Sequence, residues 1–171
     1  DRLEALSDAH QAWRSRRRLL ATQGWPGARY LALHTLSHLL MREVALECGY
    51  GSASISERIY SRTGANPMAG VLLYTAAPDS EGTLGGLVSL GEPATLERLI
   101  KQALAHAAVC ASDPMCAEHV PDDGEDSLHG AACHACLFAP ETSCERGNRY
   151  LDRSFAVDTF TETGLALFSS P

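Results

Sequence analysis

Five cysteines lie close together in the C-terminal third of the chain, in a stretch with little else to fold around. They are Cys110, Cys116, Cys133, Cys136 and Cys144, and Cys133 and Cys136 form a Cys-x2-Cys pair. The segment is rich in turn formers and poor in large apolar side chains, so it cannot build a core of its own. Thiolates from two separated segments can complete a tetrahedral zinc site, and metal binding then supplies folding free energy. We therefore predict a structural zinc site formed by four of these five cysteines.

Other interpretations of the cysteines are weaker. A redox Cys-x2-Cys pair begins a helix directly after a strand, whereas residues 130–132, before Cys133, are Gly-Ala-Ala. A catalytic zinc needs an open coordination position and a nearby general base, whereas a set made only of cysteines favours a closed structural site. Three nearby histidines could replace a cysteine as a zinc ligand: His119, His129 and His134.

Composition restricts the compartment and the class of partner. No apolar run approaches the roughly 18 residues of a membrane span, and the first residues lack the pattern of a secretory signal. We therefore expect a cytoplasmic location, where clustered cysteines favour metal over disulfides. A start without methionine, directly in a helical pattern, is typical of a piece of a longer protein.

The charge distribution leaves two interpretations of one basic cluster. The net charge of −7 argues against a broad nucleic-acid surface. Arg14, Arg16, Arg17 and Arg18 nevertheless concentrate positive charge near the N-terminus. This cluster is either a solvated helix face or a local DNA contact.

Hydrophobic periodicity predicts an α+β fold, a helical domain with a small sheet and a cysteine-rich, zinc-stapled C-terminal lobe. We expect helices over residues 3–20, 28–48 and from Pro93 to about 109, with Gly49 as a C-cap. Strands over 54–61 and 71–76 are expected to pair as a hairpin through the turn at 63–67. A last helix is expected from Asn148 to about Phe160. The lone Cys48 in the second helix is expected to be a core residue.

We expect the chain to be organised in four parts. These are an N-terminal helix and linker (1–27), an α+β core (28–109), a zinc-binding lobe with its closing helix (110–160), and a tail (161–171).

His34 and His38 lie one helical turn apart, a spacing that can bind a metal. Thr35 occupies the place of the glutamate in a HExxH motif, so a zincin is excluded. Buried histidines hydrogen-bonded to Glu43 or Glu57 are the favoured interpretation. The alternative is a metal-dependent nuclease or hydrolase that uses His34, His38 and nearby acids.

A glycine-rich loop from Asp79 to Gly86 follows the second predicted strand. It lacks the lysine of a phosphate-binding loop, and its acidic residues would repel phosphate, so we predict a structural turn. A buried polar network that joins Asp79 and Arg58 to His34, His38 and Glu57 is a further possibility.

Several short motifs, in this order, resemble the MrfA zinc-binding domain family. They are Leu33–Leu40 (LHTLSHLL), Glu47–Tyr50 (ECGY), Glu57–Tyr60 (ERIY), Leu73–Thr75 (LYT) with Gly85 and Gly86, Cys133–Cys136 (CHAC), Cys144 with Glu145, and Asn148–Arg153 (NRYLDR). The resemblance covers about residues 28–160, and within the family it is greatest to the branch found in the DISARM anti-phage system. The chain departs from the family in one spacing, because Cys136 and Cys144 are farther apart than usual.

The resemblance implies a function beyond metal binding. Such domains accompany superfamily 2 helicases, in the same chain or as a partner subunit, and the DISARM branch accompanies a helicase-like DrmA subunit that is thought to engage invading DNA. The chain itself has no helicase motif. We expect a non-catalytic zinc-binding accessory domain that binds a DrmA-like helicase and DNA. A direct DNA-binding module is the other alternative.

Overall fold

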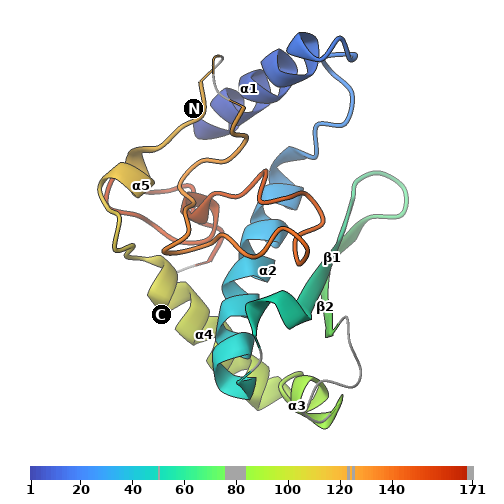
Figure 1. Ribbon diagram of the computed structural model, residues 1–171, viewed down its shortest axis with the longest axis vertical. Coiled ribbons are helices and arrows are strands. Elements are labelled where there is room, and N and C mark those ends of the chain that lie inside the picture. Colours follow the sequence, from blue (N-terminus) through green and yellow to red (C-terminus); the bar gives the residue numbers. More distant parts are fainter. Residues whose placement is uncertain (50, 76–83, 123, 125, 169–171) are drawn as a thin grey trace.

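One long central helix organises the computed structural model, which describes residues 1–49, 51–75, 84–122, 124 and 126–168. This helix, α2, runs from Gly27 to Cys48, and the other elements pack around it (Figure 1). Helix α1 (Arg2–Arg16) lies near its N-terminal end, a β-hairpin lies along one side, and helix α4 (Pro93–Ala107) crosses its C-terminal end. The irregular C-terminal segment covers the remaining side.

Helix α2 forms where the apolar periodicity predicts it. Leu31, Leu39, Leu40 and Val44 are buried, because helical residues three or four apart share a face. The helix ends at Gly49, whose φ of 68° lies in the left-handed region that glycine adopts at little cost. Cys48, expected in the core, is only partly buried at the last turn.

The predicted hairpin is confirmed. Strands β1 (Ile55–Arg62) and β2 (Met68–Thr75) pair antiparallel, with Ile55 opposite Thr75 and Arg62 opposite Met68. One face of the hairpin packs on α2 through Ile55, Glu57 and Ile59. Its other face is exposed.

The remaining elements are short. They are a 3-10 turn at Ser52–Ser54, helix α3 at Leu84–Ser89, helix α5 at Met115–Glu118 and a second 3-10 turn at Arg153–Phe155. Helix α1 begins with a capping box between Asp1 and Glu4 and ends at Arg16, four residues before the predicted end. Among the described residues, no helix has the length and apolar character needed to cross a bilayer.

The predicted closing helix over residues 148–160 is wrong, because only the 3-10 turn at Arg153–Phe155 is helical there. Asn148 and Tyr150 have φ angles of 59° and 63°, in the left-handed region, and the backbone of residues 150–153 pairs with the stretch around Gly130. Tyr150 N–H donates to the Leu128 carbonyl, Gly130 N–H donates to the Leu151 carbonyl, and Arg153 N–H donates to the Ala131 carbonyl. Backbone groups used in this way cannot form helical hydrogen bonds.

Two buried clusters flank the length of α2. The first joins Leu6 and Ala9 of α1 to Tyr30 and Leu31 of α2. The second joins the C-terminal half of α2 to α4 and to the turn that contains Cys136. The irregular segment is therefore packed against both halves of the central helix.

Candidate metal centre

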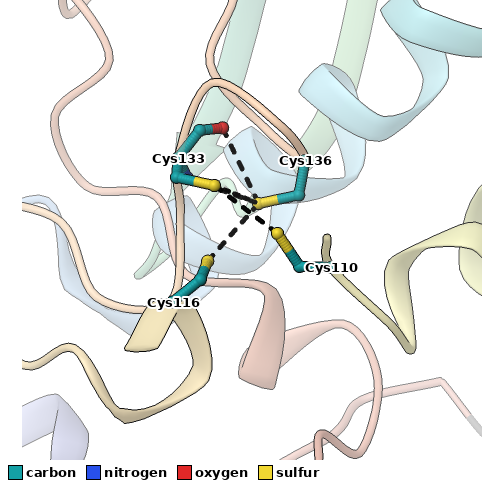
Figure 2. A group of neighbouring side chains, drawn as sticks. All are labelled: Cys110, Cys116, Cys133 and Cys136. Atoms are coloured by element: carbon teal, nitrogen blue, oxygen red, sulfur yellow. Dashed lines mark hydrogen bonds between the residues drawn. The ribbon is translucent and has the colours of Figure 1, made fainter. Parts of the chain in front are cut away.

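Four cysteine sulfurs converge beyond the end of helix α4 (Figure 2). Cys110 follows α4, Cys116 lies in α5, and Cys133 and Cys136 lie in one turn. The sulfur–sulfur distances are 3.5 Å (Cys110–Cys133), 3.6 Å (Cys116–Cys136) and 3.7 Å (Cys133–Cys136). A disulfide has a length of about 2.05 Å, so these are free thiols.

The geometry of the four sulfurs fits a zinc ion. Four thiolates at about 2.3 Å from a tetrahedral zinc lie about 3.8 Å from one another, close to the observed separations. Cys110, Cys116 and Cys136 are buried and Cys133 is partly buried. Four sulfur ligands would fill every position of a tetrahedral ion, which is typical of a structural site.

The electrostatics of the four thiols explain why they need a cation. Burial favours the neutral form of Cys133, but hydrogen bonds from the Ala135 backbone and from neighbouring groups outweigh it and lower its pKa to about 7. Hydrogen bonding to Cys136, together with burial, raises the pKa of Cys116 far above its usual range. Adjacent thiolates repel one another, so all four ionise only when a metal balances their charge.

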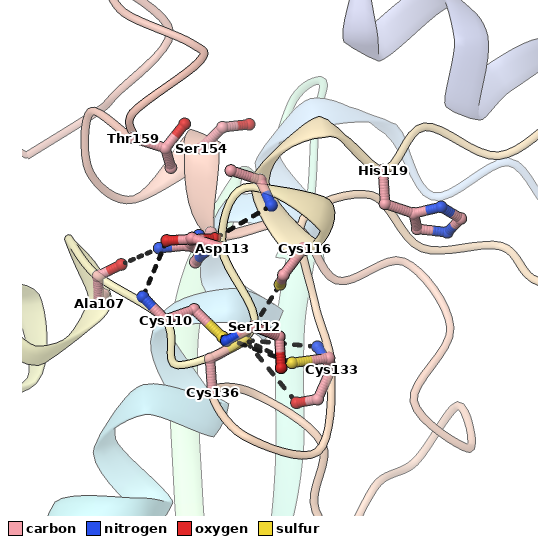
Figure 3. Close-up of polar contacts among 12 residues, drawn as sticks. Ala107, Cys110, Ser112, Asp113, Cys116, His119, Cys133, Cys136, Ser154 and Thr159 are labelled. Carbon is pink, nitrogen blue, oxygen red and sulfur yellow. Dashed lines mark hydrogen bonds and ion pairs between the residues drawn. The ribbon is translucent and has the colours of Figure 1, made fainter.

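An ion pair between Asp113, which is partly buried, and Arg153, which is fully buried, holds the backbone around Cys110 and Cys116. Asp113 lies between them and accepts hydrogen bonds from the backbone N–H groups of Cys110 (2.9 Å) and Ala117 (3.1 Å) (Figure 3). Arg153 pairs with the same carboxylate and donates to the Ala107 carbonyl at 2.9 Å. Burial raises the pKa of Asp113, but the hydrogen bond and charge of Arg153 outweigh it and hold the pKa below its ordinary value.

The fifth candidate ligand, Cys144, lies apart from these four. Its sulfur belongs to a second buried group with His34, His38 and Glu57, whose ligand atoms all lie within 4.8 Å of one another. Cys144 was expected from the sequence to compete for a place in the single zinc site, whereas the structure places it in a separate group. The long spacing between Cys136 and Cys144 was the only sequence signal of this separation.

The second group unites helix α2, strand β1 and the loop at Cys144. His34 Nε2 lies 2.8 Å from Glu57 Oε1 and 3.2 Å from Cys144 Sγ, and His38 Nε2 lies 3.3 Å from Glu57 Oε1. Burial by itself would raise the pKa of Cys144, but hydrogen bonds with His34 and His38 lower it to about 6. Burial would lower the pKa of His38, but hydrogen bonds with Cys144 and Glu57 raise it to about 9.

This group contains three members of the polar network considered from sequence. Arg58 is not among them, because its exposed side chain lies 3.6 Å from Glu145. Glu43 also lies elsewhere and contacts His106 at 2.8 Å. Asp79 and most of the glycine-rich loop fall outside the described residues.

The three histidines that could replace a cysteine ligand do not join either group of candidate ligands in the described part of the chain. His119 and His129 contact each other with ring centroids 4.6 Å apart, and His134 contacts Phe138. These three side chains therefore pack against other rings near the turn that contains Cys133 and Cys136.

The arginine cluster is partly engaged within the molecule. Arg16 and Arg17 lie 3.4 and 3.2 Å from Asp126, in pairs that remain exposed. Arg17 also lies over the ring of Trp13, 4.2 Å from its centroid, and Arg149 approaches the same ring at 5.3 Å.

Comparison with known proteins gives two matches. The sequence profile described as MrfA Zn-binding domain matches residues 36–137, which include His38, Glu57 and the four clustered cysteines. The chain is also 45% identical over 163 residues to the DISARM protein DrmB of Bacillus paralicheniformis. That alignment covers 92% of this chain but 27% of the relative, so the chain spans about a quarter of the protein it matches.

Proposed function

Because this chain belongs to the MrfA zinc-binding domain family, we propose that it is a non-catalytic zinc-binding accessory domain of a bacterial anti-phage defence complex. Its partner is a helicase or translocase subunit of the DrmA type. The observation that carries this proposal is the similarity to a DISARM protein over nearly the whole of the chain. Zinc fits a scaffolding role, because it fixes a segment that has little regular structure.

The burial of both ligand groups supports a role without catalysis. Hydrolysis at a metal needs an open position for water and access for the substrate. The side chains of His34, His38 and Glu57 have no exposed surface. This burial gives no support to the nuclease or hydrolase alternative.

The outer face of the hairpin is a candidate surface for the helicase-like subunit. Tyr60, Met68, Leu72 and Tyr74 are each more than a third exposed on this face. Aromatic and apolar anchors of this kind supply most of the binding energy in protein interfaces. In Figure 1 the hairpin lies to one side of α2, where another protein could reach it.

Co-purification with the helicase-like subunit tests this proposal. Replacing Leu72 and Tyr74 with aspartate should weaken the complex at least tenfold, because both side chains are exposed and neither contributes to the core. Leu46→Asp is the matched control, since Leu46 is 71% exposed on α2. Unchanged affinity in the double variant would exclude the hairpin face, and no complex with the unaltered protein would exclude the helicase partner.

One observation favours DNA contact as an additional function. Arg17, the residue after α1, and Arg149 of the C-terminal segment both approach Trp13, so the fold combines arginines that are distant in sequence. Arginines around an aromatic ring suit phosphate contact and base stacking. This patch is local in a chain whose net charge is −7.

Salt-dependent DNA binding tests the patch. Replacing Arg17 and Arg149 with alanine should weaken binding and make the slope of log affinity against log salt less steep by about two. Arg98→Ala is the control, because Arg98 is exposed and pairs with Glu47 on the far part of the fold. Equal binding by all three proteins would rule out this patch as a DNA contact.

A further inference from the structure

We propose that His34, His38, Glu57 and Cys144 form a second, independent zinc site. Four donor atoms from three parts of the chain converge here: two imidazole Nε2 atoms, a carboxylate oxygen and a thiol sulfur. The contacts among them are 2.8 to 3.3 Å long. A tetrahedral zinc with nitrogen, oxygen and sulfur ligands has edges of about 3.3 to 3.6 Å, so slight expansion around an ion would satisfy its geometry.

The orientation of both histidines suits metal binding. His34 Nδ1 lies 3.2 Å from the Tyr150 carbonyl oxygen, and His38 Nδ1 lies 2.8 Å from the Leu137 carbonyl oxygen. A carbonyl only accepts, so each Nδ1 carries a hydrogen, and a neutral ring then directs its Nε2 lone pair at the centre. Metal-binding histidines are commonly oriented in this way, by a carbonyl on the nitrogen that does not bind the metal.

The Cys144 sulfur is surrounded as a thiolate would be. The backbone N–H groups of Arg146 and Asn148 donate to it at 3.4 and 3.2 Å. Cys110, in the four-cysteine cluster, accepts the same kind of bond from Ser112, two residues further along, at 3.4 Å. The loop after Cys144 thus resembles the backbone of a metal-binding cysteine turn.

Hydrogen bonding alone leaves this group incompletely satisfied. The Nε2 atom of His34 faces both Glu57 and Cys144, and one N–H cannot point well at both. The second oxygen of Glu57 is buried and has no hydrogen-bond partner among the described residues. A metal ion bound by all four side chains would interact with His34 Nε2, the Glu57 carboxylate and the Cys144 sulfur at the same time.

Charge balance also favours a divalent ion. Glu57 and Cys144 carry two negative charges when ionised, and their burial requires two positive ones. Two protons on the histidines would place like charges on rings whose centroids lie 4.7 Å apart. One divalent ion supplies the same charge without that repulsion, and the mixed nitrogen, sulfur and oxygen set is one that zinc accepts.

The proposed site differs from the four-cysteine cluster in ligand type, and this difference supplies the test. The purified protein should contain two zinc ions per chain by elemental analysis. After exchange with 113Cd, NMR should show one resonance in the range of four sulfur ligands and a second well upfield of it. A single zinc in the folded protein, or a lone all-sulfur resonance, would overturn the proposal.

Three matched variants assign the ions. Cys144→Ala should lose the upfield resonance and one zinc, Cys116→Ala should lose the all-sulfur resonance, and Cys48→Ala should keep both, because Cys48 lies in neither group. Two zinc ions retained in Cys144→Ala would contradict the assignment. If that variant fails to fold, the cadmium spectrum of the unaltered protein decides the question.

Discussion

At the scale of one residue, Arg153 is a buried charge that is balanced by a counter-charge. Its side chain has no exposed surface, yet it carries a full positive charge beside the cysteine cluster. Asp113 neutralises that charge and at the same time accepts the backbone N–H of Cys110. The carboxylate of Asp113 therefore connects Arg153 in the C-terminal segment to the backbone of Cys110, a candidate zinc ligand.

Removing the charge of Asp113 should strongly destabilise the protein. Asp113→Asn leaves Arg153 buried without a counter-charge, a change that typically costs about 3–5 kcal/mol. Asp126→Asn is the control, because its pairs with Arg16 and Arg17 are exposed and should contribute little to the free energy of unfolding. Urea denaturation of both variants measures the two free energies of unfolding, and equal values would show that the buried pair has no special role.

At the scale of elements, an irregular stretch around Leu151 lies where a helix was expected. It pairs with the stretch around Gly130, directly before the Cys-x2-Cys turn. Asp152 lies at the centre of this pairing and accepts a hydrogen bond from Arg2 of α1 at 3.0 Å. The pairing therefore joins the N-terminal helix, the cysteine turn and the C-terminal segment.

The closeness of this pairing can be tested with one methyl group. In Gly130→Ala the new Cβ would clash with the buried carboxylate of Asp152. That carboxylate cannot move away without breaking its hydrogen bond with Arg2. We expect a loss of about 1–3 kcal/mol or more in unfolding free energy, measured by thermal or urea denaturation. Gly70→Ala meets nothing within 4 Å and should change stability by less than about 0.5 kcal/mol. Similar effects from both substitutions would argue against a tight contact.

At the scale of the whole molecule, we expect the hydrophobic core to stabilise one part of the fold and bound metal to stabilise the other. Helices α2 and α4 and the hairpin pack through apolar side chains, whereas the described residues between Cys110 and Asp152 include only one short helix. Family membership confirms the prediction that this is a zinc-binding domain. The division of the chain into four parts stays a prediction.

Zinc removal should therefore loosen one half of the molecule first. A strong chelator should lower the melting temperature by on the order of 10 °C, since loss of a few kcal/mol shifts a domain of this size by that amount. Hydrogen exchange should rise in residues 128–137 and 144–153 before it rises in α4. Chelator already loaded with zinc is the control, and uniform exchange across the chain would contradict a local role for the metal.

Local pattern alone was enough to predict helices α2 and α4, the hairpin and the presence of zinc. Apolar periodicity, a glycine C-cap, turn residues and clustered cysteines each act over a few neighbouring positions, so they can be read without knowing the fold. The prediction of a closing helix was wrong because it relied on local pattern alone. Asn148 has the character of an N-cap, but its side chain instead bridges the backbone of Ala139, a contact that no local pattern reports.

Only the tertiary structure decided which candidate ligands lie together. His34 and Cys144 are separated by 110 positions, and they meet because the C-terminal segment packs back along α2. Spacing in the sequence shows which thiols could bind zinc, but not which segments the core brings together. The chemistry of these side chains was therefore determined by the sequence, whereas their grouping into a four-cysteine cluster and a histidine–glutamate–cysteine group depended on long-range packing.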